Sequence, residues 1–122
     1  MMIRILQPDF RFEDDRGNLV QLVHEGYQQY NILFSKKGAE RGSHYHKQNN
    51  ETFYVISGAL HLKVMDQEEK EESYLFQTGE MFLIPPFVTH SFLYDEDTFL
   101  ASMYSKGVVN QDGTKDIYEG RP

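Results

Sequence analysis

The stretch RGSHYHKQNNETF, residues 41–53, holds three side chains of the kinds that bind metals or transfer protons. His44 and His46 are separated by one residue, and Glu51 follows after a short polar linker. Side chains alternate between the two faces of a strand, so His44 and His46 are expected to point the same way, about 6 to 7 Å apart. Imidazole nitrogens and carboxylate oxygens are ligands for divalent transition metals. The spacing therefore predicts a metal site.

The polar linker KQNN, residues 47–50, decides whether Glu51 can join the histidines. Glu51 lies five residues after His46, an odd offset that would place it on the opposite face of a continuous strand. Adjacent asparagines tolerate left-handed backbone angles and suit a hairpin loop. We therefore expect a hairpin in which His46 and Glu51 are cross-strand neighbours, with Cβ atoms about 5 Å apart.

A fourth ligand is expected from GEMFLIPPFVTHSF, residues 79–92. The two prolines lack N–H groups, so the chain must turn there before it re-enters a sheet at His90. The predicted site holds one divalent transition metal (zinc, iron, manganese or nickel) and leaves room for water or substrate. Its ligands are His44, His46, Glu51 and His90. The other two histidines, His24 and His61, are expected at the surface.

The elements that must position these residues are short strands. Turn signals separate nine apolar runs, which is typical of an all-β sandwich or barrel. We predict a single domain over residues 1–122, with an antiparallel β-barrel at about 10–105. The polar tail, residues 105–122, is either loosely ordered or laid over the barrel mouth, and the acidic run 66–72 is a solvated hairpin tip. The nine runs are residues 19–23, 30–34, 43–46, 52–57, 59–65, 73–77, 80–84, 89–94 and 98–104.

Composition excludes several classes of partner. The net charge of −7 opposes binding to nucleic acid, because that affinity depends on basic residues that neutralise phosphates. With no cysteine, any metal must be held by nitrogen and oxygen ligands. No apolar run approaches the roughly 20 residues that span a bilayer, and MMIRILQPDF lacks the apolar region of a signal peptide. We expect a cytoplasmic protein that acts on a small molecule.

Both histidine-bearing segments resemble the paired motifs of the cupin superfamily, small β-barrel proteins that bind metals and sugars. The first motif is matched at every spacing, by Gly38, His44, His46, Glu51 and Gly58. The second motif is matched by Gly79, Pro85 and His90, but Phe87 replaces its second glycine and Tyr94 its asparagine. The resemblance implies a jelly roll, also called a double-stranded β-helix.

A narrower resemblance concerns DDRGNLVQL (14–22) and RGSHYHK (41–47). These stretches are similar to cupins of sugar-nucleotide pathways: deoxythymidine-diphosphate-sugar 3,4-ketoisomerases, 3,5-epimerases and the cupin domain of capsular-polysaccharide enzymes. The resemblance implies an isomerase or epimerase that acts next to a keto group of a nucleotide sugar. In the metal-free members the histidine at the place of His44 is a base, whereas in metal cupins it is a ligand. Glu51 and His90 favour a metal.

Two further residues receive roles under this hypothesis. Arg41 could bind the diphosphate with a two-pronged contact, or form a surface ion pair. Tyr94 shares the face of His90 and could relay protons alongside His44 as the base. The alternatives are a metal-dependent dioxygenase, for which the expected apolar lining is also suitable, and a sugar-binding or effector-binding module without catalysis. That lining consists of Phe53, Val55, Leu60, Leu62 and Phe92.

The edge strand IRIL, residues 3–6, invites pairing with a second copy, and we expect a homodimer.

Overall fold

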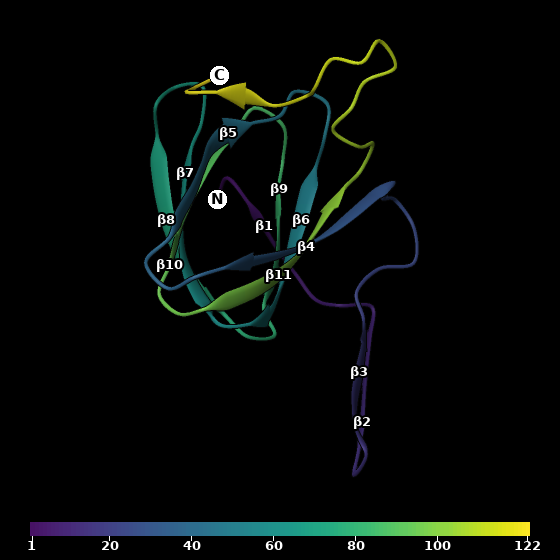
Figure 1. Ribbon diagram of the computed structural model, residues 1–122. Helices are drawn as coiled ribbons and strands as arrows, with labels where there is room; N and C mark the ends of the chain where they lie inside the picture. Colours follow the sequence, from purple (N-terminus) through teal and green to yellow (C-terminus); the bar gives the residue numbers. More distant parts are fainter.

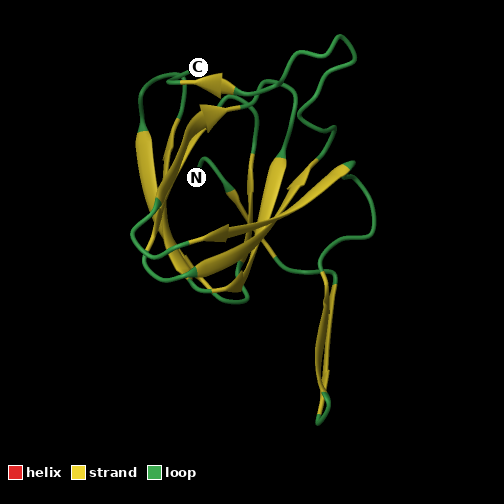
Figure 2. Ribbon diagram, in the orientation of Figure 1, coloured by secondary structure: helices red, strands yellow, loops and turns green.

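The computed structural model describes residues 1–122 and contains twelve strands and no helix (Figure 2). The all-β prediction is confirmed, and each of the nine predicted runs overlaps a strand. The chain has no helix that could cross a membrane. The strands are β1 (Arg4–Leu6), β2 (Phe10–Asp14), β3 (Gly17–Gln21), β4 (Gln29–Ser35), β5 (Glu40–Tyr45), β6 (Glu51–Ser57), β7 (Ala59–Met65), β8 (Glu71–Gln77), β9 (Met81–Ile84), β10 (Thr89–Tyr94), β11 (Thr98–Tyr104) and β12 (Tyr118–Glu119).

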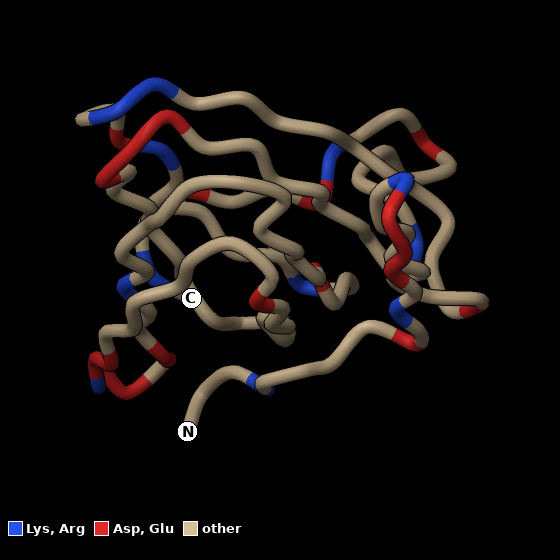
Figure 3. Tube along the Cα trace, turned by 90° about the horizontal axis from the view of Figure 1, so that it is seen from below, with Lys and Arg blue, Asp and Glu red and all other residues tan.

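Two five-stranded antiparallel sheets face each other (Figure 1). The first has the order β1-β9-β6-β11-β4 and the second β12-β5-β10-β7-β8. Strands β2 and β3 pair only with each other and project from the body as a hairpin arm (Figure 1). Lysines, arginines and acidic residues are interspersed along the trace (Figure 3).

The core lies between the two sheets because each strand turns every second side chain inward. Aromatic rings hold its centre, with Phe82 stacked on Phe76 at a centroid distance of 4.1 Å and on Phe53 at 5.2 Å. Burying one such side chain contributes roughly 1.5 to 3 kcal/mol. The prediction of the apolar lining is confirmed only in part. All five of its residues are buried, but only Phe53 and Phe92 line the cavity that holds the predicted ligands, whereas Val55, Leu60 and Leu62 belong to the core.

The predicted hairpin between His46 and Glu51 is wrong. Strand β5 belongs to the second sheet and β6 to the first, so residues 47–50 cross from one sheet to the other. The buried side chain of Asn49 holds this crossing. Its amide nitrogen donates to the backbone carbonyl of Gly107, and its amide oxygen accepts from the backbone N–H groups of Lys106 and Gly107. The polar linker is therefore specified by contacts with a distant segment.

The C-terminal tail lies over one end of the barrel, which is the second of the two predicted alternatives. Strand β12 pairs with β5, and the ring of Tyr118 stacks on Tyr45 at 5.4 Å.

The predictions for the other surface residues are also confirmed. His24 and His61 are exposed beside Asp9 and Asp95. Residues 66–70 of the acidic run form the solvent-facing turn between β7 and β8, and residues 71 and 72 begin β8.

Phe87 stands in the turn before β10, where the cupin motif has glycine. Phe87 adopts a left-handed backbone angle, with φ of 62°. Its N–H donates to the backbone carbonyl of His46 at 2.8 Å, and its ring lies 6.4 Å from that of Tyr45. This turn therefore ties the segment that carries His90 to the segment that carries His46.

Candidate active site

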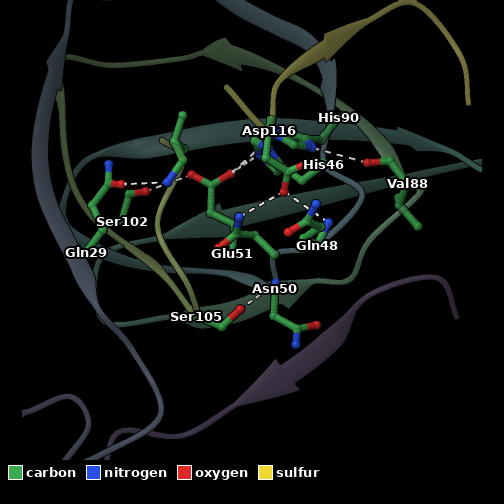
Figure 4. Close-up of polar contacts among 12 residues, drawn as sticks. Gln29, His46, Gln48, Asn50, Glu51, Val88, His90, Ser102, Ser105 and Asp116 are labelled. Atoms are coloured by element: carbon green, nitrogen blue, oxygen red, sulfur yellow. Dashed lines mark hydrogen bonds and ion pairs between the residues drawn. The ribbon is translucent and has the colours of Figure 1, made fainter. Parts of the chain in front are cut away.

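Three predicted ligands meet inside the barrel. His46 follows β5, Glu51 begins β6 and His90 lies on β10, and the three side chains are 3%, 4% and 4% exposed. Glu51 Oε1 is 3.0 Å from His46 Nε2 and 3.5 Å from His90 Nε2 (Figure 4). The two sheets thus bring together residues that the sequence assigns to three separate strands.

The other nitrogen of each ring faces a backbone carbonyl. His46 Nδ1–H donates to Asp116 at 2.6 Å, and His90 Nδ1–H donates to Val88 at 3.2 Å. A carbonyl only accepts, so these contacts fix the proton on Nδ1 and leave the Nε2 lone pair facing the carboxylate of Glu51. Two acceptors at 3.0 Å repel each other unless a proton or a cation lies between them. The geometry therefore calls for a positive charge at this point.

The ionisation of the site agrees with that requirement. Burial alone would raise the pKa of Glu51, but hydrogen bonds and the charges of His46 and His90 lower this pKa to about 2. Burial alone would lower the pKa of His46, whereas its contacts with Glu51 and Asp116 raise that pKa above its ordinary value. The carboxylate is therefore charged at neutral pH.

Two residues of β11 support Glu51 from its other side. Ser102 Oγ donates to Glu51 Oε2 at 2.7 Å (Figure 4). The ring of Tyr104 packs edge-on against His46 at 5.2 Å. Burial and the nearby negative charge of Glu51 raise the pKa of the Tyr104 hydroxyl, so it stays protonated. Both oxygens of Glu51 therefore have polar neighbours.

Asp116 links the site to the C-terminal tail. Its fully buried carboxylate accepts hydrogen bonds from the backbone N–H groups of Lys47 and Gln48 at 2.8 and 3.0 Å, and from the Asn49 side chain at 2.8 Å. Its backbone carbonyl accepts from His46. One residue of the tail thus fixes both the crossing loop and the ring orientation of His46.

All six residues predicted for the site line one cavity of about 190 Å³. A larger hollow, about 560 Å³, lies over β5, β10 and β7 and includes none of the clustered ligands. The smaller cavity is the candidate active site because it contains the clustered histidines and the glutamate. It is lined by Leu33, Arg41, Gly42, His44, His46, Glu51, Phe53, His90, Phe92, Tyr94, Tyr104 and Ile117.

His44 occupies a different position in the cavity from the three clustered ligands. It pairs with His90 in the β5–β10 ladder and is only partly buried. The donor atoms of His46, Glu51 and His90 all lie within 4.8 Å of one another, and His44 is not part of this group. The structure therefore places the four predicted ligands around one cavity but gathers three of them.

Arg41 and Tyr94 lie on the same side of the cavity. Arg41 Nε donates to Ser35 Oγ at 2.8 Å, and another guanidinium nitrogen contacts the Phe34 carbonyl at 3.3 Å. Arg41 makes these contacts without an ion pair to an acidic side chain. Tyr94 is 1% exposed, and burial raises the pKa of its hydroxyl.

The cluster fits a divalent transition metal. Bonds from zinc to histidine nitrogen and carboxylate oxygen are about 2.0 to 2.2 Å long, which sets tetrahedral ligands a little over 3 Å apart. The two contacts to Glu51 Oε1 match this spacing, and both rings carry the carbonyl-bound Nδ1–H that orients metal-binding histidines. His46, Glu51 and His90 could therefore hold the ion.

Sequence reasoning missed Ser102, Tyr104 and Asp116. Strand alternation could have found the first two, because positions 100, 102 and 104 of the run TFLASMY share the inward face with buried Leu100. Asp116 offers no such signal, since it lies in a tail without periodicity and acts on residues about 70 positions earlier.

The structure has an RmlC-like cupin jelly-roll fold, in which a His–Glu–His cluster lies between the sheets. Comparison with family models matches residues 12–117 to the polysaccharide biosynthesis C-terminal domain, and the chain belongs to this family. A comparison with curated proteins finds no match.

Solved structures share the fold at low sequence identity. The sugar 3,4-ketoisomerase QdtA from Thermoanaerobacterium thermosaccharolyticum, in complex with TDP, aligns over 98% of this chain and 88% of its own, with a TM-score of 0.78 and 16% identity. The TDP-quinovose 3,4-ketoisomerase WlaRB from Campylobacter jejuni aligns over 93% and 92%, with a TM-score of 0.77 and 16% identity. The dTDP-4-dehydrorhamnose 3,5-epimerase from Sulfolobus tokodaii aligns over 85% and 70%, with a TM-score of 0.72 and 23% identity.

Proposed function

We propose that this protein is a metal-assisted isomerase or epimerase that acts next to the keto group of a nucleotide-linked sugar. The observation that carries the proposal is the placement of His44 in the cavity of the His46–Glu51–His90 cluster but outside the cluster itself. Proteins with this fold include a 3,4-ketoisomerase variant solved with TDP-4-keto-6-deoxyglucose and a 3,5-epimerase solved with dTDP-4-keto-L-rhamnose.

The proposed division of roles is supported by the geometry of the cavity. His46, Glu51 and His90 would hold the divalent ion, which would supply polarisation of a carbonyl oxygen and stabilisation of an enolate. His44 has a lone pair that is not committed to the ion, so it can accept a proton. In this arrangement His44 does not have to serve as both metal ligand and base.

His44 and Tyr94 would carry out the proton transfers. His44 removes the proton from the carbon next to the carbonyl, and the electron pair of that bond forms the enolate. For epimerisation, Tyr94 relays a proton from solvent to the opposite face of the same carbon, which inverts it, and His44 releases its proton to solvent. For isomerisation, Tyr94 relays the proton of the neighbouring hydroxyl to the former carbonyl oxygen, and His44 returns its proton to the former carbonyl carbon.

Arg41 is proposed to bind the diphosphate. A cavity of about 190 Å³ is smaller than the roughly 300 to 1,000 Å³ of pockets that enclose whole ligands. It suits a sugar ring, which leaves the nucleotide outside. Arg41 is largely exposed and also lines the hollow beside the cavity, and guanidinium groups bind phosphate oxygens in pairs.

The test is solvent exchange. The metal-loaded protein is incubated in deuterium oxide with TDP-4-keto-6-deoxyglucose, and proton NMR follows the carbons next to the carbonyl. The proposal predicts deuterium at one or both carbons. Binding without exchange would support a non-catalytic sugar-binding module instead. Oxygen consumption by the iron-loaded protein with an aromatic or enolic substrate, without exchange, would support a dioxygenase.

A further inference from the structure

The C-terminal tail places one apolar side chain at the opening of the candidate active site. Ile117 lines the cavity that holds the clustered ligands, yet this residue is 37% exposed. Phe53 and Phe92, which line the same cavity, are 3% and 6% exposed. A lining residue that keeps contact with solvent lies at the mouth of a cavity, whereas buried lining residues form its inner wall. Ile117 therefore belongs to the mouth.

Anchors on both sides hold Ile117 in this place. Asp116 is fully buried, and its carboxylate binds the loop that crosses between the sheets (Figure 4). Tyr118 stacks on Tyr45 at 5.4 Å, and the ammonium group of Lys47 lies 4.2 Å from the centre of the Tyr118 ring. Side chains alternate along an extended segment, so Ile117 points the opposite way from Tyr118. Its two neighbours therefore fix the position of Ile117 at the mouth.

Leu33 forms a second apolar part of the mouth. It is half-buried and lies on β4, an edge strand of the first sheet, whereas Ile117 precedes β12, an edge strand of the second sheet. Both residues line one cavity, so its mouth lies between these two edges. Arg41 spans the same gap, because it lies on β5 and donates to Ser35 and Phe34 of β4. The mouth therefore presents two apolar side chains and one guanidinium group.

The proposed function leaves the apolar mouth without a role. The polar residues of the cavity are assigned to the reacting carbons, the keto oxygen and the diphosphate. The inner aromatic residues, Phe53 and Phe92, pack edge-on against the ring of His90 at 6.4 and 5.9 Å. Leu33 and Ile117 remain, and their side chains offer neither a donor nor an acceptor to the hydroxyl groups of a sugar. An apolar substituent is the part of a sugar that fits between them.

We propose that Ile117 is a specificity-determining residue, which together with Leu33 contacts an apolar substituent of the bound sugar. The ligand class is a deoxy sugar whose methyl group lies at the mouth, in preference to a sugar with a hydroxymethyl group at the same carbon. A hydroxymethyl group there loses water from its hydroxyl without gaining a hydrogen-bond partner. The role given to Ile117 rests on the proposed function, because the occupant of the cavity is taken to be a nucleotide-linked sugar.

The test compares the affinities of TDP-6-deoxyglucose and TDP-glucose for the purified protein by isothermal titration calorimetry. The two ligands differ only by the hydroxyl on carbon 6, and neither has a keto group, so binding is measured without turnover. Wild-type protein is expected to bind the deoxy ligand roughly ten-fold to a hundred-fold more tightly, which is the discrimination that an apolar pocket achieves against an added hydroxyl. TDP alone is the reference for the nucleotide part.

Ile117→Ser should remove most of this preference, because a hydroxyl at the mouth can pair with the hydroxyl of TDP-glucose. Its affinity for TDP-6-deoxyglucose should fall roughly ten-fold, whereas its affinity for TDP should stay unchanged. Ile117→Val keeps a branched apolar side chain and should keep the preference. Val109→Ser is the matched control, because Val109 is 63% exposed in the same tail and lies outside the cavity lining. Thermal unfolding checks that all variants are folded.

Equal affinities of wild-type protein for the two nucleotide sugars would overturn the role of Ile117, and so would an unchanged preference in Ile117→Ser. A loss of affinity for TDP itself in that variant would assign the residue to the nucleotide and would also overturn it. Wild-type protein that binds neither nucleotide sugar would contradict the proposed function, and the role of Ile117 with it. Binding with the expected preference but without deuterium exchange would support the role of Ile117 and contradict only the proposed reaction.

Discussion

His46 Nδ1 lies 2.6 Å from the backbone carbonyl of Asp116, 70 residues further along the chain. This contact fixes which nitrogen of His46 faces Glu51. The carboxylate of the same aspartate holds the loop that follows His46. The C-terminal tail is therefore part of the site.

Replacing Asp116 by Ala should destabilise the metal-free protein by about 3 kcal/mol or more, because it leaves two backbone N–H groups and the Asn49 amide without their buried acceptor. Urea unfolding measures the change. The control is Asp112→Ala in the same tail, where the exposed carboxylate accepts only from Thr114, and the expected loss is about 1 kcal/mol or less. Equal losses in the two variants would contradict the role given to Asp116.

Glu51→Gln should abolish stoichiometric metal binding. The substitution keeps the size of the side chain but removes the charge that both Nε2 atoms face. Elemental analysis after purification without added metal, and thermal stabilisation by zinc, give the readouts. Glu71→Gln, at an exposed ion pair with Lys63, should behave like wild type. Full metal content in Glu51→Gln would show that the ion binds elsewhere.

Ser102→Ala tests the support of Glu51 from β11. The variant loses the 2.7 Å hydrogen bond to Glu51 Oε2 but retains every clustered ligand. Loss of such an outer partner typically lowers metal affinity 10-fold to 100-fold. Competition titration with a chelator measures the affinity. An unchanged dissociation constant would remove Ser102 from the site.

The left-handed backbone at Phe87 can be tested by the sign of the stability difference between two variants. Phe87→Gly and Phe87→Ala both remove the ring that lies near Tyr45. At an ordinary position Ala is more stable than Gly, but with φ of 62° the glycine variant should be the more stable by about 1 kcal/mol. Thermal unfolding of the two variants gives the difference. A more stable alanine variant would contradict the left-handed turn.

The sequence was sufficient to predict most of the strands, because alternating apolar residues and turn signals act locally. It also predicted that His46, Glu51 and His90 meet. The path of the chain between His46 and Glu51 could not be predicted. A hairpin and a crossing between sheets are both compatible with the same polar residues, and the crossing is stabilised by hydrogen bonds between Asn49 and Gly107. Strands β2 and β12 were not predicted either. β2 gains no burial in the core, and β12 is a two-residue strand held by β5.

The most direct test of the division of roles is deuterium exchange into TDP-4-keto-6-deoxyglucose by His44→Asn, compared with wild-type protein at equal bound metal. His44 lies outside the three-ligand cluster, so the variant is expected to retain the ion. Loss of the base should slow exchange by roughly 100-fold to 10,000-fold. Exchange at the wild-type rate in the metal-loaded variant would contradict the account.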